Sequence, residues 1–399
     1  MNQELARHLE QLAAQGMLRT LSPYRRDGTT LVRDSDRDLL NLSSNDYLGL
    51  AGDARLLAEF YAELAGDGEA LLEKYGLGVA SSRLLTGDTA VAHRLEAELS
   101  RLYGRSGRSA LLFNSGYHAN IGIIPALLSK GDLVLSDKFN HASLHDGLRI
   151  GRADCKRFNH GDYAQLRRLL EQERGRYRQV AIVSESVFSM DGDCADLAEL
   201  VRLKKEFACL LYLDEAHAVG LYGEHGLGLA ERDGVVDDID LLVGTFGKAC
   251  GSVGAFLICA DEVRDYLINT SRSLIFTTAL PPVVLSWNLF VFQKIPAMAA
   301  QRKHLQQLSG QLREELRQRH LPTAGTTNIV PVIVGSAERT VAGAAHLREQ
   351  GFLVLPVRPP TVPAGTSRFR LSLTAALQWQ DIEPLPDLIH GWLTDGSRA

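Results

Sequence analysis

Lys248 is the residue whose surroundings point most clearly to chemistry. It follows an apolar run, residues 239–246, that predicts a buried strand, and small residues come directly after it. Burial of a lysine at such a strand end disfavours the charged ammonium form and lowers its pKa. A neutral amine is what Schiff-base formation with a carbonyl compound requires. The same pattern also fits a lysine that reaches from a strand end to solvent.

An acidic residue and a histidine follow another apolar run. Asp214 ends the stretch CLLYLD, and His217 comes three residues later. A carboxylate at a buried strand end is costly unless something positive pairs with it, and the pyridinium nitrogen of pyridoxal phosphate would be such a partner. His217 is then placed to bond the phenolic oxygen of that cofactor. Alternatively, Asp214 caps the next turn and His217 closes it.

Further polar residues follow other apolar runs. His141, in the segment NHAS, either stacks on a ring or bonds a loop carbonyl. Gly116 and Tyr117 open a predicted helix, where free amides and the helix dipole favour phosphate.

Three rival motifs fit less well. A Walker A loop ending at Lys248 needs Gly at 242 and Ser or Thr at 249, where the chain has Leu242 and Ala249. The pair of Thr245 and Lys248 lacks the SDN and KTG companions of a serine nucleophile. Residues 76–78 (GLG) form half of a dinucleotide fingerprint but follow no convincing strand, which is weak support for NAD.

The elements that must position these residues alternate along the chain. Apolar runs that predict strands are SALLFN, DLVLSD, QVAIVSES, ACLLYLDE, IDLLVGTF and VGAFLICA, and amphipathic segments such as 163–176 and 197–207 predict helices between them. This order predicts an α/β fold with a mostly parallel sheet covered on both faces. The short connection before the last run favours a hairpin. Ligands of such sheets bind beyond the carboxyl ends of the strands, where the polar residues above collect.

The chain divides into three predicted regions. Residues 1–50 form an N-terminal arm with a first helix, and residues 51–290 form the large α/β domain. Residues 291–399 follow a strand-helix-strand-strand-helix order, which predicts a small α+β domain with an antiparallel sheet.

Composition restricts the class of protein further. The 399 residues carry 43 Lys and Arg against 48 Asp and Glu, a net charge of -5 that disfavours a dedicated nucleic-acid-binding protein. No apolar stretch approaches the ~20 residues that span a bilayer, and the N-terminus has no signal-peptide pattern. The five cysteines are widely spaced without CxxC, so we expect reduced thiols, no metal site and a cytoplasmic location.

The chain resembles the α-oxoamine synthases, a family of fold-type I pyridoxal-phosphate enzymes, over nearly its full length. TFGK, DEAH and FSMDGD are specific to that family, and RPPTVPAGT points to one branch of it. The matching segments are NLSSNDYLGL (41–50), FNSGYHAN (113–120), DKFNHASLHDG (137–147), ESVFSMDGD (185–193), DEAHAVGLYGEHGLG (214–228), TFGKACGSVGA (245–255), IFTTALPP (275–282) and RPPTVPAGTSRFRLSLTAA (358–376).

The resemblance assigns roles to individual residues. Lys248 would hold the cofactor and move protons, His141 would stack on its ring, and Asp214 would pair with the ring nitrogen. The cofactor-binding set that it implies is Gly116, Tyr117, His141, Ser189, Asp214, His217, Thr245, Lys248 and Thr278, the last from the partner subunit. The substrate-binding set that it implies is Arg19, Asn45, His141, Thr361 and Arg370. Arg358 lies in the same motif without a definite role.

The activity that the resemblance implies is a decarboxylative condensation in biotin biosynthesis. L-Alanine would react with a pimeloyl thioester, carried on acyl carrier protein or coenzyme A, in a cytoplasmic homodimer that needs neither nucleic acid nor membrane. Alternatives are a sister enzyme such as a glycine-using 2-amino-3-ketobutyrate ligase, or a non-catalytic pyridoxal-phosphate module. Arg25-Arg26 and Arg167-Arg168 are candidate contacts for the carrier.

Overall fold

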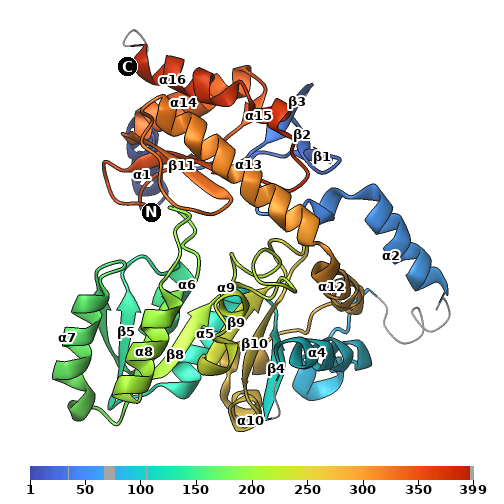
Figure 1. The fold of residues 1–399 in the computed structure, drawn as a ribbon, viewed down its shortest axis with the longest axis vertical. Coiled ribbons are helices and arrows are strands. Elements are labelled where there is room, and N and C mark those ends of the chain that lie inside the picture. Colours follow the sequence, from blue (N-terminus) through green and yellow to red (C-terminus); the bar gives the residue numbers. More distant parts are fainter. Residues whose placement is uncertain (35, 67–76, 105–106, 396–399) are drawn as a thin grey trace. The chain divides into compact units, whose positions relative to one another are not determined.

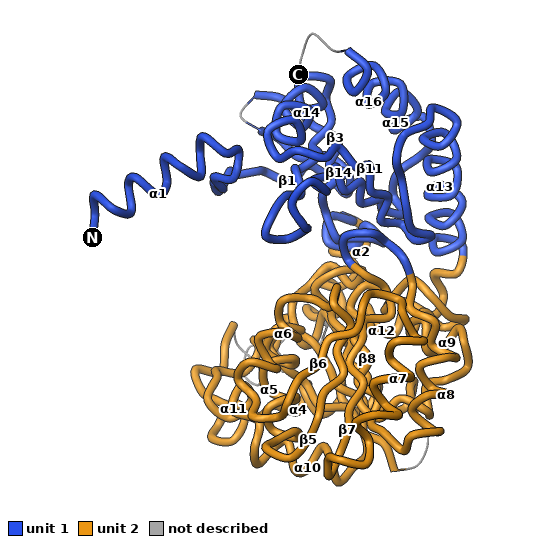
Figure 2. Tube along the Cα trace, turned by 90° about the vertical axis from the view of Figure 1, so that its left-hand side faces the viewer, with its two compact units in different colours: residues 1–54, 189–193, 300–399 blue, residues 55–188, 194–299 orange. Residues whose placement is uncertain are grey.

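A computed structural model of the chain describes residues 1–34, 36–66, 77–104 and 107–395. It divides into two compact units (Figure 2). The first unit comprises Met1–Ala54, Ser189–Asp193 and Ala300–Ala399, and the second comprises Arg55–Phe188 and Cys194–Ala299. The predicted division at residues 50 and 290 into an arm, a large domain and a small domain stays a prediction.

The second unit is built around a seven-stranded sheet with the order β4-β10-β9-β8-β7-β5-β6. Neighbouring strands from β9 to β6 run parallel, whereas β10 pairs antiparallel with both β9 and β4. The mostly parallel sheet and the antiparallel last strand predicted from the sequence are therefore confirmed. The strands are β4 (Arg108–Phe113), β5 (Asp132–Asp137), β6 (Asp154–Phe158), β7 (Gln179–Glu185), β8 (Leu210–Asp214), β9 (Leu241–Thr245) and β10 (Ala255–Ala260).

Helices cover both faces of this sheet (Figure 1). Asp162 begins α7 because its side chain accepts the otherwise unpaired amide of Gln165. On one face, buried Ile123, Leu144 and Leu267 of α5, α6 and α10 join the apolar side chains of the strands in one core. The longer helices of this unit are α4 (Ala90–Tyr103), α5 (Gly116–Leu127), α6 (Ala142–Ile150), α7 (Tyr163–Glu173), α8 (Leu197–Phe207), α10 (Asp261–Thr270) and α12 (Pro282–Lys294), with α2 (Ala54–Gly66) at its boundary and α9 (Leu229–Arg232) and α11 (Arg272–Ile275) as short helices.

The first unit contains two small sheets. The C-terminal part forms the predicted antiparallel sheet, in the order β11-β14-β13. A second sheet joins three strands of the N-terminal segment to a short C-terminal strand, which the sequence did not predict. The elements are α1 (Asn2–Ala14), β1 (Arg25–Asp27), β2 (Leu31–Asp34), β3 (Arg37–Asn41), α13 (Ala299–Gln318), β11 (Ile329–Gly335), α14 (Ala337–Glu349), β12 (Phe352–Leu353), β13 (Pro356–Val357), β14 (Ser367–Ser372), α15 (Trp379–Ile382) and α16 (Leu385–Thr394).

Within residues 1–34, 36–66, 77–104 and 107–395, no single helix has the length and apolar composition to cross a membrane; only the bent pair Pro282–Ala297 and Ala299–Gln318 meets both criteria, taken together. In that same part of the chain, no three His, Cys, Asp or Glu side chains are grouped so as to hold a metal ion.

Candidate active site

Asp214 stands at the carboxyl end of β8 and is 5% exposed. Its Oδ1 accepts a hydrogen bond from the Ala216 amide at 2.9 Å, and its Oδ2 accepts one from Asn120 Nδ2 at 2.9 Å. Both donors are neutral amide groups, so neither of them brings a positive charge to this buried carboxyl group. A cationic group such as a pyridinium nitrogen would compensate the negative charge of its carboxylate form. The surroundings of Asp214 therefore fit pyridoxal phosphate.

Lys248 lies in the turn between β9 and β10 and is half-buried. Thr245, 7% exposed at the end of β9, fixes this turn: its Oγ1 donates to the Gly254 carbonyl at 2.9 Å and accepts the Gly247 amide at 3.1 Å. Because β8 and β9 are paired parallel neighbours, Asp214 and Lys248 follow strands that end at the same edge of the sheet.

His141 follows β5 and is the N-cap of α6, and the first turn of that helix bonds its ring. Its Nδ1 accepts the Ser143 amide at 3.2 Å and lies 2.7 Å from Ser143 Oγ. Although part of the ring has lost its contact with water, His141 as a whole remains exposed. An exposed ring that is fixed at one nitrogen is suited to cover a planar ligand.

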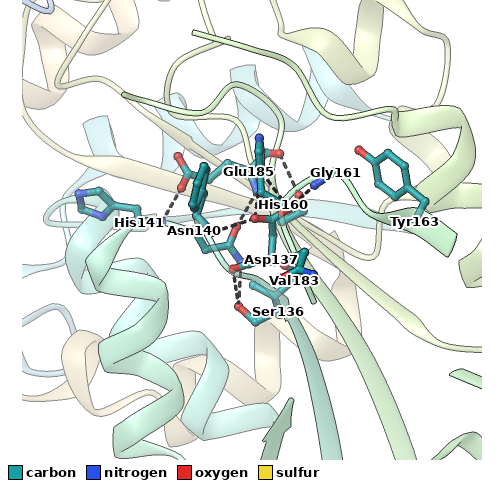
Figure 3. A network of polar contacts seen from close by, with 12 residues as sticks. Ser136, Asp137, Asn140, His141, His160, Gly161, Tyr163, Val183 and Glu185 are labelled. Carbon is teal, nitrogen blue, oxygen red and sulfur yellow. Dashed lines mark hydrogen bonds and ion pairs between the residues drawn. The ribbon is translucent and has the colours of Figure 1, made fainter. Parts of the chain in front are cut away.

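A second group of contacts fixes the loop that carries His141 (Figure 3). Glu185, at the end of β7, accepts the His141 amide through Oε1, and its own amide donates to Asn140 Oδ1 at 3.2 Å. Asn140 Nδ2 donates in turn to Ser136 Oγ at 2.9 Å and to the Val183 carbonyl at 2.8 Å. The loop is thereby tied to two neighbouring strands, β5 and β7.

These groups share one electrostatic environment. Burial raises the pKa of Glu185 well above its usual value, the charge of Asp214 raises it further, and the charge of Lys248 opposes both. Loss of water lowers the pKa of His141; Asp214 opposes that shift and Lys248 adds to it. The structure thus brings together Asp214, Lys248 and His141, the three residues predicted to be catalytic.

The remaining residues predicted for this unit lie on the same strand ends or on loops. Gly116 begins α5, with Ser115 as its cap, and a Cβ at Gly116 would meet no atom within 4 Å, which leaves room beside the first amides. Tyr117 is 45% exposed and donates to Asp146 at 2.7 Å. His217 is 5% exposed in the turn after β8. Thr278 is exposed after α11, where its carbonyl accepts Asn114 Nδ2 at 2.7 Å.

In the first unit, Arg370 of β14 is the centre of a second group. It is 8% exposed, and its guanidinium donates to the Ser189 carbonyl at 2.5 Å, to Asn45 Oδ1 at 3.2 Å, to Tyr47 OH at 3.2 Å and to Ser372 Oγ at 3.3 Å. The structure brings together the predicted residues Asn45, Ser189 and Arg370. Ser189 enters this group through its carbonyl.

Two further arginines of this unit lie close to each other. Arg19 donates to the Pro359 carbonyl at 3.1 Å, and Arg358 donates to the carbonyl of Leu18. Burial lowers the pKa of Arg358, and the charge of Arg19 lowers it further. Exposed Thr361 bonds the Arg358 carbonyl through its amide at 3.1 Å. The predicted residues Arg19, Thr361 and Arg358 therefore form one positively charged group.

Four residues in these groups had no assigned role in the sequence. Asn120, Ser143, Glu185 and Tyr47 all lie inside the motifs quoted above, so the motifs pointed to their segments. Their partners come from other elements, and only the fold identifies them. Of the GLG segment considered above as half of a dinucleotide fingerprint, residue 76 lies outside the described residues. Leu77 and Gly78 lie in an irregular segment.

Comparison with known proteins identifies the family. A family model described as aminotransferase class I and II matches residues 37–389. An 8-amino-7-oxononanoate synthase from Chlorobaculum parvum is 49% identical over 96% of this chain and 97% of its own length. A putative enzyme of the same name from Glaesserella parasuis is 50% identical over 95% and 98%.

Solved structures agree with this comparison. A serine palmitoyltransferase from Sphingomonas wittichii superposes with a TM-score of 0.87 at 30% identity, covering 97% of this chain and 96% of that one. Another from S. paucimobilis, with a bound PLP–myriocin adduct, gives 0.86 at 29% identity, covering 98% and 96%. An 8-amino-7-oxononanoate synthase from Francisella tularensis gives 0.75 at 26% identity, covering 90% and 98%.

Proposed function

The chain belongs to the aminotransferase class I and II family, and on that basis we propose that it condenses L-alanine with a pimeloyl thioester. The products would be 8-amino-7-oxononanoate, carbon dioxide and the free thiol, in biotin biosynthesis. The observation that carries this proposal is the close similarity, over nearly the whole chain, to synthases of that name. The chain is a pyridoxal-phosphate-dependent acyltransferase of this family.

Pyridoxal phosphate, when bound, withdraws electrons from the α-carbon of the amino acid, which makes the α-proton acidic. We assign to Asp214 the task of keeping the ring nitrogen protonated, because a carboxylate in a dry site stabilises a cation far more than in water. Lys248 would hold the cofactor and then move the α-proton, which requires its neutral amine. His141 would cover one face of the ring.

The other predicted residues would hold the ends of the cofactor. His217, which follows Asp214 by three residues, is assigned to the phenolic oxygen. For the phosphate and the adjoining ring edge we keep the set Gly116, Tyr117, Ser189, Thr245 and, from a partner subunit, Thr278. The open space at the start of α5 supports this assignment, because an anion can approach the helix amides there.

Substrate carboxylates would be bound by the arginines of the first unit. Arg370, with Asn45 beside it, offers a fixed fork of donors that suits the amino-acid carboxylate. Arg19, Arg358 and Thr361 are assigned to the acyl substrate, whose distal carboxylate would compensate the mutual repulsion of the two guanidinium groups. The carbon–carbon bond forms between the α-carbon and the thioester carbonyl carbon; the thiol leaves and the alanine carboxylate departs as carbon dioxide.

The cellular context is also part of the proposal. A homodimer is implied if Thr278 reaches the site of a second copy. All five cysteines, which lie in the described part of the chain, are thiols rather than disulfides, and this supports the cytoplasm, where thiols remain reduced. We propose no nucleic-acid, membrane or metal partner. As for the carrier, Arg26 pairs with Asp46 at 3.0 Å and Arg167 pairs with Glu206, which leaves less of their charge for an acyl carrier protein.

The test is a comparison of substrates with the purified holoenzyme. L-Alanine with pimeloyl-CoA and with pimeloyl-acyl carrier protein should each be assayed against glycine with acetyl-CoA and serine with palmitoyl-CoA. We expect kcat/KM to be highest for alanine with a pimeloyl donor, and the ratio of the two donors identifies the carrier. A preference for glycine with acetyl-CoA, or turnover with none of them, would overturn the proposal.

A further inference from the structure

We propose that Asn120 is a positioning residue that orients Asp214 and, through Ser143, couples it to His141. The inference rests on the proposed function in one respect: it takes Asp214 and His141 as the residues that contact the cofactor ring. It adds to that function two residues, Asn120 of α5 and Ser143 of α6, that act through Asp214 and His141.

The Asn120 side chain joins three elements of the second unit. From α5, Asn120 Nδ2 donates to Asp214 Oδ2 of β8 at 2.9 Å and to Ser143 Oγ of α6 at 2.8 Å. On its other side, Oδ1 accepts the hydroxyl of Tyr212, also of β8, at 2.5 Å. Asn120, Ser143 and Tyr212 are each 1% exposed, so water does not compete for these bonds.

The carboxylate of Asp214 determines which way the amide of Asn120 points. An asparagine has two N–H donors and one carbonyl acceptor, and here both donors and the acceptor have partners. Turning the amide over would set its oxygen against the Asp214 carboxylate, two acceptors without a proton between them. Because only one orientation is favourable, Asn120 in turn holds Asp214 Oδ2 in a single position. The donor is neutral, so this alignment does not cancel the charge that a ring nitrogen needs.

The bond from Asn120 also decides what the Ser143 hydroxyl can do. Since Ser143 Oγ accepts from Asn120, its own proton is free to be donated to His141 Nδ1, 2.7 Å away. The Ser143 amide points at the same nitrogen from 3.2 Å. An Nδ1 that accepts from two donors leaves the proton of a neutral imidazole on Nε2. The lowered pKa of His141 agrees with a neutral ring.

The chain from Asp214 through Asn120 and Ser143 to His141 therefore fixes two properties together. One is the direction of the carboxylate, and the other is the tautomer of the histidine. Residues that lie 94 and 23 positions apart in the chain are involved, which explains why no local motif reveals the connection. Both properties matter for the proposed cofactor site, because Asp214 is assigned to the nitrogen of the cofactor ring and His141 to one face of that ring.

The experiment uses the holoenzyme and two readouts that need no acyl substrate. In Asn120→Ala, we expect the affinity of the apoenzyme for pyridoxal phosphate to fall by about ten- to a hundredfold, the range for a hydrogen bond to a charged group. The pH titration of the cofactor's visible absorbance should move to higher pH, because a less well held Asp214 leaves the ring nitrogen less positive and the imine keeps its proton longer.

Ser143→Ala separates the two branches. This variant keeps the bond between Asn120 and Asp214, so the Kd for pyridoxal phosphate should stay within about twofold of the wild-type value. That change is well below the tenfold change in Kd to which about 1.4 kcal/mol of binding free energy corresponds. The acidic limb of the kcat/KM profile should move to higher pH, because His141 Nδ1 loses a donor and is more easily protonated. If Ser143→Ala instead weakens cofactor binding as much as Asn120→Ala, the proposed division of roles is wrong.

The control is Thr340→Ala, which removes a fully buried hydroxyl of α14, in the first unit, that donates to the Ser336 carbonyl at 2.6 Å. We expect it to lower thermal stability and to leave the absorbance titration unchanged. If Asn120→Ala does not fold, Tyr212→Phe replaces it: loss of the hydroxyl loosens the same amide and should shift the titration upward by a smaller amount. An unshifted titration in the folded Asn120 or Tyr212 variant, or an equal shift in the Thr340 control, would overturn the inference.

Failure of the proposed function would look different. A holoenzyme that binds pyridoxal phosphate and shows these shifts but does not turn over alanine with a pimeloyl thioester refutes the substrates and retains the role of Asn120. Normal turnover of the wild type, together with an unshifted titration in Asn120→Ala, retains the proposed substrates and refutes the role of Asn120.

Discussion

Asp214 ends β8 and Lys248 follows β9, and these strands lie side by side and run in the same direction, which places both residues at one edge of the sheet. At the scale of single residues, the first consequence concerns the lysine. Lys248→Ala should lower kcat by at least about 10²–10⁴-fold, the contribution of a positioned acid–base group, and abolish the visible absorbance of the lysine-bound cofactor. Both are measured on the same purified sample, and substantial activity in the variant would contradict its assignment.

A second residue-scale prediction concerns Tyr47, which is fully buried. Its hydroxyl accepts from Arg370 at 3.2 Å and donates to Asn45 Oδ1 at 3.0 Å, so it fixes two residues assigned to the amino-acid carboxylate. Tyr47→Phe should raise KM for alanine about two- to tenfold, the value of one neutral hydrogen bond, with little change in kcat. Steady-state kinetics at saturating thioester tests this. A fall in kcat with an unchanged KM would count against it.

The residues that could be predicted are those with a distinctive type at a strand end. Lys248, Asp214 and His141 each follow or end an apolar run, and their coincidence at one edge of the predicted sheet predicts a site. Asn120 and Tyr47 could not be given roles, because a buried amide or phenol has meaning only through its partners. Those partners lie on other elements, 94 and 323 residues away.

At the scale of elements, the turn after β8 carries a buried acid next to Asp214. Glu215 accepts the Leu229 amide at 2.8 Å and the Ala230 amide at 3.0 Å, which are the first amides of α9. Burial raises the pKa of Glu215 to about 8. The folded state therefore holds the proton more tightly than the unfolded chain, whose value is near 4.5.

The consequence is a pH dependence of stability with a definite sign. The contribution of Glu215 is fully present below about pH 4.5 and is lost as the pH rises to about 8, because the buried acid must then ionise. Relative to Glu215→Gln, which cannot ionise, the wild type should lose free energy of unfolding between pH 5 and pH 8. Urea denaturation of both proteins at the two pH values measures the difference. A gap that does not change with pH would contradict the assignment.

Elements were predictable where hydrophobic runs are long. Six of the seven strands of the large sheet are mostly buried and read as continuous apolar runs, so these strands and their mostly parallel direction were predicted. The seventh, β6 (DCKRF), was missed, because it is polar and largely exposed. Strands β1 to β3 were missed, because segments such as RRD and RDLLN are short and polar and show little alternation. The pairing of β3 with β12, about 310 residues later, depends on the tertiary fold.

At the scale of the whole molecule, the proposal requires two chains for each complete site. Thr278 is exposed on its own chain, and we assign it to the cofactor phosphate of a second copy. Lys248→Ala and Thr278→Ala subunits, both inactive or weak alone, should then complement each other. In a mixed dimer one site has both intact residues and the other has neither.

Random mixing makes half of the dimers mixed, and each of those has one intact site of two, so about a quarter of wild-type activity should return in the mixture and about half in the purified mixed dimer. The two variants are co-expressed with different tags, and the mixed species is purified through both. Recovery in the mixed dimer supports a shared site. Activity no higher than that of the Thr278→Ala parent would show that Thr278 serves its own chain.

The proposed reaction is a condensation that removes the carboxylate of the amino acid. The most direct measurement incubates the holoenzyme with L-alanine carrying ¹³C in its carboxyl group and with a pimeloyl thioester, then follows the label by mass spectrometry. We expect labelled carbon dioxide in step with thiol release, and an unlabelled 8-amino-7-oxononanoate. Label retained in the condensation product, or carbon dioxide released without the thioester, would contradict the proposed function.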